Sequence, residues 1–367
     1  MINILYLSNQ KYFNGGAARS LYELLEHLDR QRVNPYFASI YNDKVAQRIK
    51  ELEIPFFQIS RRTRFTPPLF AFSNVGSIIK YIHQNKIDII HNNQCDDALY
   101  SWLPAKLTST PIIIHHRDPS FYKRSRFLMK YVDANIAISS WQNRTNLSNN
   151  GIVIHNGIDL KNYPTMKNEE HHLFEPDNGK TKVGLLGRIM PYKAQDIYIK
   201  AAALVLEKYN NVQFLIIGDD HDPSSLEYIE SLKSIIRELR IQEEVLFTGY
   251  IPESWTILPE LDISVVPSRK EPFGRVTIES MACAIPVIAT NVWGALDIVT
   301  PETGILIPPD DPEALAEAIL VLLNSPEKRR VMGEAGRKRV EEFFTIDFMM
   351  QNIYKLYDEV LAGRAHH

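Results

Sequence analysis

The feature that most constrains the fold of this chain is a repeated alternation of short apolar runs with longer amphipathic stretches. Strands that alternate with helices form parallel sheets with right-handed crossovers, so the alternation predicts an α/β fold. In the first half the expected strands are Ile2–Leu7, Tyr36–Ile40, Ile87–His91, Pro111–His115 and Asn135–Ser139. The expected helices are Ala17–Leu28, Val75–Asn85, Tyr100–Leu107 and Ser125–Tyr131.

The second half repeats this alternation. Its expected strands are Lys182–Leu186, Gln213–Ile217, Glu244–Thr248, Ile263–Val266, Pro286–Ala289 and Gly304–Ile307. Its expected helices are Ala194–Tyr209, Ser225–Arg240, Val276–Ala282, Pro312–Leu323 and Pro326–Phe343. The polar stretch Leu160–Lys180 separates the halves, and 367 residues exceed the roughly 250–300 that one core supports. We therefore expect two doubly wound α/β domains, with a last helix, about Ile346–Leu361, packed on either of them.

Composition excludes several classes of protein. The net charge of −3 argues against a dedicated nucleic-acid binder, which carries a basic surplus. Cys95 and Cys283 are the only cysteines, so neither a disulfide scaffold nor a zinc site is expected. No apolar run reaches the ~20 residues that span a bilayer, and the N-terminus lacks the basic region of a signal peptide. These features predict a cytoplasmic protein.

The strongest candidate site is the segment from Glu271 to Glu279, which reads EPFGRVTIE. A strand leads into a loop, Gly274 and a helix that we expect to begin at about Val276, where backbone N–H groups favour an anion such as a diphosphate. Glu279, in the expected first turn, suits the hydroxyls of a ribose, and Glu271 those of a hexose. The plain alternative is that Glu279 only offsets the helix dipole and that Glu271 is a solvated loop residue.

Two further segments follow strands and carry groups that bind phosphate. Gly187 to Lys193 places the cations Arg188 and Lys193 at a strand end, as a diphosphate leaving group requires. Gly15 and Gly16 precede the first helix and permit close approach of an anion. The alternatives are two surface cations and a simple turn. The pattern is not G-x-G-x-x-G, so a dinucleotide site is not expected.

Two mixed segments lie in the first half. In His115-His116-Arg117-Asp118 the period of two places His115 and Arg117 on one face, and histidines there can orient a donor or move a proton. The alternative is a packed strand end. Arg61–Phe72 mixes cations with aromatic residues, which is typical of a segment that meets an anionic lipid surface or an anionic acceptor. The alternative is an ordinary connection between elements.

Taken together, these residues resemble retaining glycosyltransferase family 4. The matching features are Gly15-Gly16, the His/Arg cluster, His155-Asn156-Gly157-Ile158-Asp159, Gly187-Arg188 with Lys193, the TGYIP segment from Thr248, the E-x7-E pair, PVIAT from Pro286 and GILIPP from Gly304. The resemblance implies the GT-B fold, in which two Rossmann-like domains face a central cleft. It implies an acceptor-binding domain over residues 1–158, a nucleotide-sugar-binding domain over 159–345, and a helix over 346–361 that packs back on the first domain.

The resemblance also implies roles for single residues. Arg188 and Lys193 would bind the donor diphosphate, helped by backbone amides of Gly16, Phe273, Gly274, Val276 and Thr277. Glu279 would take the ribose hydroxyls and Glu271 the 3- and 4-hydroxyls of the sugar, while Tyr250 and Ile251 line the base. Asn156 would sit near the interdomain hinge. The implied catalytic set is Arg188, Lys193, Glu271, His115, His116 and Arg117, and the implied binding set is Gly15, Gly16, Asn156, Gly187, Tyr250, Ile251, Phe273, Gly274, Val276, Thr277 and Glu279.

Three positions depart from the family pattern. Arg117 stands where the family often has a histidine, so any of His115, His116 and Arg117 is a candidate for the donor contact. Ala194 and Ala284 stand where glycine is common. Because neither alanine removes a functional group, both substitutions are expected to be tolerated.

The resulting expectation is an enzyme of polysaccharide biosynthesis that transfers a hexose-type unit, with retention, from a nucleoside diphosphate sugar to a hydroxyl. The acceptor would be a saccharide, a lipid-linked saccharide or a small molecule, and neither a metal nor a covalently bound cofactor is expected. Lipid-linked acceptors would place the protein peripherally on the inner membrane face. The rival functions are a nucleotide-sugar 2-epimerase of the same fold, a glycosidase that uses Glu271 and Glu279, and a non-catalytic homologue. The helix dipole disfavours the glycosidase, since it would keep Glu279 ionised.

Overall fold

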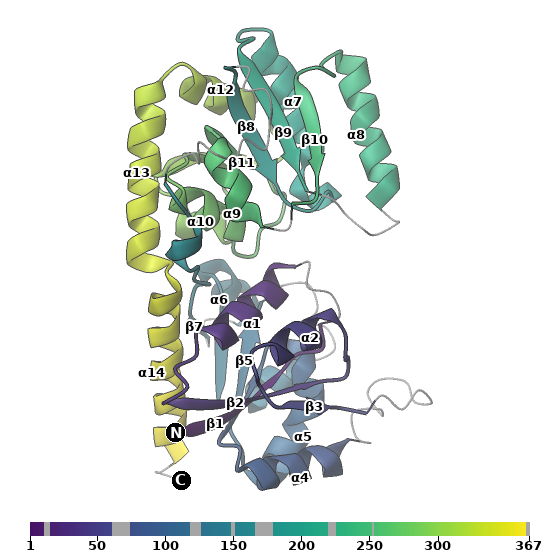
Figure 1. Ribbon diagram of the computed structural model, residues 1–367, viewed down its shortest axis with the longest axis vertical. Helices are drawn as coiled ribbons and strands as arrows, with labels where there is room; N and C mark the ends of the chain where they lie inside the picture. Colours follow the sequence, from purple (N-terminus) through teal and green to yellow (C-terminus); the bar gives the residue numbers. More distant parts are fainter. Residues whose placement is uncertain are drawn as a thin grey trace. The chain divides into compact units, whose positions relative to one another are not determined.

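The computed structural model describes residues 1–10, 15–60, 74–117, 126–147, 151–165, 179–218, 225–251 and 253–364. The chain divides into two compact units: unit 1 is Met1–Gly157 with Ile346–His367, and unit 2 is Ile158–Thr345. Each unit contains one parallel sheet with helices packed against it (Figure 1). Asp118 and the Arg61–Phe72 segment lie outside the described residues.

Unit 1 contains a seven-stranded sheet in the order β3-β2-β1-β4-β5-β6-β7, in which all paired strands are parallel. The strands are β1 (Ile2–Leu7), β2 (Val33–Ser39), β3 (Phe56–Gln58), β4 (Ile89–Asn92), β5 (Ile112–His116), β6 (Ala134–Ala137) and β7 (Ile152–Val153). The helices are α1 (Gly16–Glu26), α2 (Lys44–Lys50), α4 (Val75–Asn85), α5 (Ala98–Thr108), α6 (Ser140–Asn146) and α14 (Ile346–Arg364), with 3₁₀ turns η1 (Cys95–Asp97) and η2 (Arg126–Tyr131).

The sheet of unit 1 is buried on both faces. Ile4 and Tyr6 of β1 pack with α1, α2 and α14, whereas Leu5 and Leu7 of the same strand pack with α4 and α5. This is the alternation that a strand imposes on neighbouring side chains. Helix α14 contributes Ile346, Met349, Met350, Ile353, Leu356 and Tyr357 to the first of these clusters. The last helix of the chain is therefore part of the core of unit 1.

Unit 2 contains a six-stranded parallel sheet in the order β10-β9-β8-β11-β12-β13. The strands are β8 (Thr181–Leu186), β9 (Val212–Ile217), β10 (Val245–Gly249), β11 (Ile263–Val266), β12 (Val287–Thr290) and β13 (Gly304–Ile307). The helices are α7 (Gln195–Leu206), α8 (Leu226–Leu239), α9 (Ser254–Ile257), α10 (Arg275–Ala282), α11 (Ala295–Ile298), α12 (Pro312–Leu323) and α13 (Pro326–Phe343). The 3₁₀ turns are η3 (Leu160–Asn162), η4 (Pro191–Lys193) and η6 (Leu258–Glu260).

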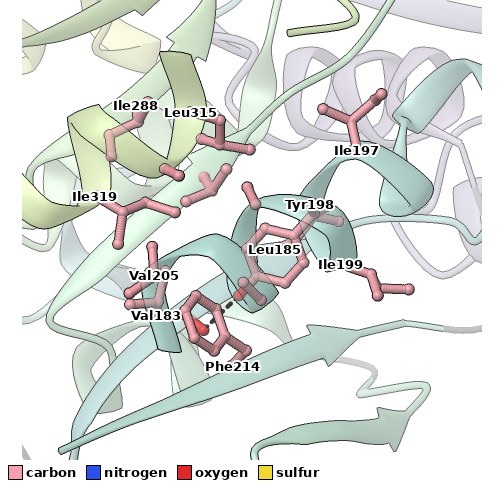
Figure 2. Packing of buried hydrophobic residues seen from close by; sticks show 14 of the residues in the cluster. Val183, Leu185, Ile197, Tyr198, Ile199, Val205, Phe214, Ile288, Leu315 and Ile319 are labelled. Carbon is pink, nitrogen blue, oxygen red and sulfur yellow. Dashed lines mark hydrogen bonds between the residues drawn. The ribbon is translucent and has the colours of Figure 1, made fainter. Parts of the chain in front are cut away.

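One face of the unit 2 sheet packs against α7, α8 and α12 around Tyr198 (Figure 2). The Tyr198 ring meets Phe214 edge-on at 5.7 Å, and its buried hydroxyl donates to the carbonyl of Val183 at 2.7 Å. A buried hydroxyl needs such a partner, so this bond fixes α7 on the sheet. The other face carries α10, whose Ser280 hydroxyl donates to Ser264 of β11 at 2.8 Å.

The predicted α/β class is confirmed, and the differences concern short elements. Strand β2 begins at Val33, earlier than the predicted start at Tyr36. Pro35 lies inside the strand, paired with Ile4, although a proline usually marks the end of a strand. Elements β3, β7, α2 and α6 were not predicted, and each has seven residues or fewer. The predicted helix Ser125–Tyr131 is instead the 3₁₀ segment Arg126–Tyr131.

The strand order of each sheet reverses beside its first strand, between β1 and β4 in unit 1 and between β8 and β11 in unit 2. Ligands of open α/β sheets bind beyond the carboxyl ends of the strands at such a switch point. The loops that follow these strands are therefore the places to look for a site.

Candidate active site

The loop after β8 carries Arg188 and Lys193. The exposed Arg188 guanidinium donates to the Tyr192 hydroxyl at 2.6 Å, and Gln195 donates to the Arg188 carbonyl at 2.9 Å. Lys193 ends η4, and Ala194 follows with a left-handed φ of 57°. The side chain of Gln195, which sequence reasoning missed, holds the loop in this conformation.

The loop begins at a close backbone approach. Gly187 donates to the Ile217 carbonyl at 2.9 Å, and a Cβ on Gly218 would lie 2.1 Å from the Gly187 oxygen. Gly218 also has a φ of 139°. Only glycine fits there, so the backbones that follow β8 and β9 are in direct contact at Gly187 and Gly218.

Lys193 and Glu271 meet at the switch point of unit 2. The Lys193 ammonium lies 2.6 Å from Oε2 of Glu271, and the Ser268 hydroxyl donates to the same oxygen at 3.2 Å. Glu271 is 8% exposed. Two predicted site residues 78 positions apart are thus brought together, and in this structure each is the partner of the other.

Arg269, in the loop that follows β11, connects this loop to α7. Its guanidinium donates to both carboxylate oxygens of Asp196, at 2.9 and 2.7 Å, and its Nε to Asp310 at 2.5 Å. Burial acts to raise the pKa of Asp196, but the bonds from Arg269 outweigh it, and the pKa is lowered. Sequence reasoning missed the ion pairs of Arg269 with Asp196 and Asp310, although the position of Arg269 after a buried strand was a signal.

Gly274 is the N-cap of helix α10; it has a φ of 106° and offers no side chain to cap the helix. The first N–H groups of a helix have no partner within it, and they attract anions. A Cβ on Gly274 would lie 3.1 Å from the Thr277 hydroxyl, which is buried and makes no hydrogen bond among the described residues. Gly274, Val276 and Thr277 therefore form the start of a helix with an unsatisfied hydroxyl beside it.

The predicted position of Glu279 was wrong. Helix α10 begins at Arg275, so Glu279 is its fifth residue and lies beyond the first turn, which contains no acidic residue. Its carboxylate accepts a hydrogen bond from Arg275 at 3.2 Å, and Glu279 is 3% exposed. Its carboxylate therefore faces Arg275 of the same helix and not the backbone N–H groups of the first turn.

The remaining predicted residues of unit 2 lie on two loops. Phe273 is buried, and its backbone packs against Gly294, where a Cβ would lie 2.4 Å from the Phe273 Cα. Gly294 also donates to the Glu271 carbonyl at 3.1 Å, and a glycine soon after β12 was the signal that sequence reasoning passed over. Tyr250, 53% exposed, and Ile251 follow β10, two strands from β8.

Unit 1 places Gly15 and Gly16 at the start of α1. Gly15 is the N-cap, makes no side-chain cap and would have open space around a Cβ. The N-cap residue of α1, like that of α10, therefore offers no side chain to the N–H groups of the first turn.

At the end of β5, His115 and Arg117 contact each other, and His116 makes a separate contact on the other face of the sheet. Arg117 donates to Nδ1 of His115 at 3.2 Å, and to Asn93 and Asn156 at 2.7 and 2.6 Å. His116 points to the other face, where its Nε2 lies 2.9 Å from Oδ1 of Asn135.

Burial is the main cause of the pKa shifts of His115 and His116. It lowers the pKa of His115 well below its usual value, with Arg117 acting in the same direction, and it lowers that of His116 to about 4. Both rings are therefore neutral at neutral pH.

The described residues contain no group of three or more His, Cys, Asp and Glu side chains that could hold a metal ion. None of the helices, as far as the structure describes them, is both long and apolar enough to cross a bilayer.

Two family models cover most of the chain. The model for glycosyl transferases group 1 matches residues 166–339, and the model for glycosyltransferase family 4 matches residues 14–162. The first covers most of unit 2 and the second most of unit 1.

Several curated proteins are similar over most of their length. The capsular polysaccharide biosynthesis glycosyltransferase CapM of Staphylococcus aureus is 27% identical over 319 residues, covering 79% of this chain and 82% of that protein. An uncharacterized glycosyltransferase of Methanocaldococcus jannaschii is 32% identical over 297 residues, covering 76% and 77%.

Solved structures share the fold of the whole chain. Anabaena HepE in complex with UDP and glucose has a TM-score of 0.81 at 21% identity, covering 98% of this chain and all of HepE. Sucrose-phosphate synthase of Thermosynechococcus elongatus has a TM-score of 0.78 at 22% identity, covering 99% of this chain. The chain is therefore a glycosyltransferase with the GT-B fold, and it belongs to glycosyltransferase family 4.

Proposed function

We propose that this enzyme transfers a hexose-type sugar, with retention, from a nucleoside diphosphate sugar to a hydroxyl of a saccharide, a lipid-linked saccharide or a small molecule. The observation that carries the proposal is the convergence of Lys193 and Glu271 at the switch point of unit 2. Arg188 lies on the same loop as Lys193, and the uncapped start of α10 follows Glu271. A cationic loop and a helix start suit a diphosphate, and a carboxylate suits sugar hydroxyls.

Each group has a separate task in this proposal. Arg188, Lys193 and the N–H groups that follow Gly274 bind the diphosphate, and the unsatisfied Thr277 hydroxyl completes that set. Glu271 binds hydroxyls of the sugar, and Glu279 those of the ribose. Tyr250 and Ile251 line the base.

The nucleotide of the proposed donor is inferred from proteins similar to this chain. HepE was solved with UDP, and a Corynebacterium glutamicum relative is a GDP-mannose-dependent mannosyltransferase, 30% identical over 210 residues. UDP and GDP sugars are accordingly the first donors to test.

The chemistry that we propose needs charge stabilisation more than proton transfer by the protein. The bond between the sugar C1 and the diphosphate oxygen breaks, and the acceptor oxygen bonds to C1 on the same face. The acceptor proton passes to the departing diphosphate. Arg188, Lys193 and the start of α10 stabilise the negative charge that builds on the diphosphate in an oxocarbenium-like transition state.

Unit 1 would bind the acceptor. CapM is named for capsular polysaccharide biosynthesis, and a Bacillus anthracis relative, 24% identical over 352 residues, is N-acetyl-alpha-D-glucosaminyl L-malate synthase. Polymeric and small acceptors are therefore both within the proposal, as is peripheral contact with the inner membrane face. We further propose that transfer needs no metal, which activity in excess EDTA tests.

The test combines donor binding with turnover. Calorimetric titration with UDP-glucose, GDP-mannose and ADP-glucose should give saturable binding for one of them. Arg188→Ala should then lower the transfer rate of that labelled donor by about 10²-fold. Lys208→Ala, which removes an exposed cation elsewhere on unit 2, should leave the rate unchanged.

Three results would contradict the proposal. Absence of binding to every nucleoside diphosphate sugar would favour a non-catalytic homologue. Isomerisation of the donor without an acceptor would favour a 2-epimerase. Inversion at the anomeric carbon, read by NMR of the product, would remove the retaining mechanism.

A further inference from the structure

The two cations of the proposed diphosphate site lie around one aromatic ring, that of Tyr192 in the η4 turn. Arg188 donates to the Tyr192 hydroxyl at 2.6 Å, and its guanidinium carbon lies 5.9 Å from the centre of the ring. The Lys193 ammonium lies 5.6 Å from the same centre. Aromatic rings attract cations at such distances, so the position of Tyr192 influences where both cations lie.

The η4 turn has few hydrogen bonds of its own. The Lys193 amide donates to the Met190 carbonyl at 2.8 Å, and the Ala194 amide donates to the Pro191 carbonyl at 3.2 Å. Ala194 has a φ of 57°, a conformation that costs an L-residue free energy. A short 3₁₀ turn that ends at such a residue persists only when surrounding contacts stabilise it.

Arg269, on the loop after β11, supplies contacts of this kind through its backbone and its side chain. Its amide donates to the Tyr192 carbonyl at 2.8 Å, and its guanidinium donates to the Pro191 carbonyl. One residue from a different loop therefore binds two successive carbonyls of the turn.

The guanidinium of Arg269 is itself fixed by two carboxylates. Both oxygens of Asp196, at the start of α7, accept from it at 2.9 and 2.7 Å, and Asp310 accepts from its Nε at 2.5 Å. Asp196 also accepts from the Tyr228 hydroxyl of α8 at 3.0 Å. Bidentate contact with a carboxylate fixes the orientation of a planar guanidinium. Arg269 thus connects the η4 turn to two helices of unit 2.

These contacts give Arg269 a different task from Arg188 and Lys193. Its hydrogen bonds go to Asp196, Asp310 and the turn, and its charge faces both carboxylates. Arg188, by contrast, donates to a neutral hydroxyl. Arg269 is therefore placed to act on the diphosphate site through the turn and not by direct contact with a ligand.

We propose that Arg269 is a positioning residue that fixes the η4 turn, and with it Tyr192, so that Arg188 and Lys193 lie in place for a nucleoside diphosphate. This inference rests on the proposed function, which assigns the diphosphate to these two cations. A cation displaced from the diphosphate stabilises the transition state less, although its charge is unchanged.

Hydrogen exchange tests the turn without any ligand. Arg269→Ala should raise the exchange rates of the Lys193 and Ala194 amides by about tenfold, the equivalent of one hydrogen bond to a charged group. Arg329→Ala is the matched control, because Arg329 donates to two carbonyls of the last turn of α12 at 2.6 and 3.1 Å, and it should leave these amides unchanged. Wild-type exchange of the turn in Arg269→Ala would overturn the proposal whether or not the chain transfers sugar.

Arg269→Lys separates geometry from charge. Lysine keeps a cation beside Asp196, but it has no planar fork with which to bind Asp196, Asp310 and the Pro191 carbonyl together. Exchange of the turn should therefore rise, and affinity for UDP or GDP should fall, as in Arg269→Ala. Wild-type affinity in Arg269→Lys would assign the effect to charge alone and contradict the proposal. This variant also keeps the test decisive if Arg269→Ala does not fold.

A comparison of ligands distinguishes a displaced phosphate site from general damage to unit 2. With the tighter-binding of UDP and GDP, Arg269→Ala should lower affinity by about tenfold, and affinity for the matching nucleoside by less than about twofold. The kcat of transfer should also fall by about tenfold. Equal losses for the nucleoside and its diphosphate would contradict the proposal. Wild-type protein that binds neither UDP nor GDP would remove the proposed function, and the exchange rates would still decide whether Arg269 fixes the turn.

Discussion

Lys193 and Glu271 form an ion pair of 2.6 Å across the switch point of unit 2, with side chains 17% and 11% exposed. The proposed function gives the two residues different parts of the donor, the diphosphate and the sugar. In the absence of a donor the carboxylate therefore holds the cation that the diphosphate would take. Binding of the donor has to share or replace this pair.

Glu271→Gln should separate the two tasks. Removing the carboxylate frees the Lys193 ammonium, so affinity for UDP or GDP without a sugar should rise by a few-fold. Transfer should fall by about 10²-fold, since an amide binds the sugar hydroxyls less strongly than a carboxylate. Titration calorimetry and steady-state rates measure the two effects. Glu313→Gln, at an exposed site on α12, should change neither the affinity nor the rate. If Glu271→Gln lowered the affinity for UDP or GDP together with the transfer rate, the carboxylate and the diphosphate would not compete for Lys193.

Ala194→Gly and Ala284→Gly should each stabilise the protein. Both alanines have a φ of 57°, a conformation that costs an L-residue about 1–2 kcal/mol and glycine almost nothing. Relief of this strain should exceed the entropy that glycine loses on folding, which leaves a gain of about 1 kcal/mol. The gain should raise the Tm of the unit 2 transition by about 2–4 °C in calorimetry.

Ala335→Gly provides the comparison. Ala335 is half-buried inside α13 with ordinary helical backbone, so glycine there should cost about 1 kcal/mol. If all three substitutions lowered the Tm alike, the left-handed conformations would not be those of the folded protein.

Gly333→Ala should destabilise unit 2 although alanine is the better helix former. A Cβ on this residue of α13 would lie 1.9 Å from the carbonyl oxygen of Ala284, so helix and loop would have to separate, at about 1–3 kcal/mol. Gly76→Ala, in α4 with nothing within 4 Å of the added atom, should stabilise by about 1 kcal/mol. Chemical denaturation of both variants tests whether packing or helix propensity determines the change in stability at each position.

Acid should destabilise unit 1 through His116. The folded state lowers the pKa of this ring to about 4, against about 6.5 when unfolded, so below pH 6.5 the unfolded chain binds the extra proton. Stability is therefore complete above pH 6.5 and is lost as the pH falls toward 4. Between pH 7 and pH 5 the loss should be about 2 kcal/mol in urea unfolding. His116→Gln should reduce this pH dependence, and the exposed His83→Gln should not; an unchanged slope in His116→Gln would exclude the ring as the cause.

The parts of the fold that sequence patterns predicted are uniform apolar runs and long amphipathic periods. Strands β1, β11 and β13 and helices α4, α12 and α13 have the predicted bounds, because their apolar periods end at prolines, glycines or charged runs. The two-residue β7 has no period to read, and β2 contains a proline that elsewhere would end a strand. The strand orders follow from crossover rules only once every strand is known.

The candidate site was predictable as a set of loops and less so as a set of bonds. Sequence position placed Lys193 and Glu271 after two different strands, but nothing in either loop indicated that they pair with each other. Glu279 was misplaced because a shift of one residue at the start of α10 changes which turn a side chain occupies. Gly294 and Arg269 were missed because their contacts join loops distant in sequence.

The position of α14 has a consequence for synthesis on the ribosome. Most of unit 1 precedes unit 2 in the chain, yet Ile353, Leu356 and Tyr357 of its core are made only after unit 2. When Gly157 leaves the exit tunnel, the face of the sheet around Tyr6 still lacks that helix. All residues of unit 2, from Ile158 to Thr345, are made before α14. Unit 1, which as the N-terminal domain would be expected to fold first, therefore cannot complete its core until unit 2 has been made. Nascent chains stalled before Ile346 should therefore carry an unfinished first half that a chaperone can recognise.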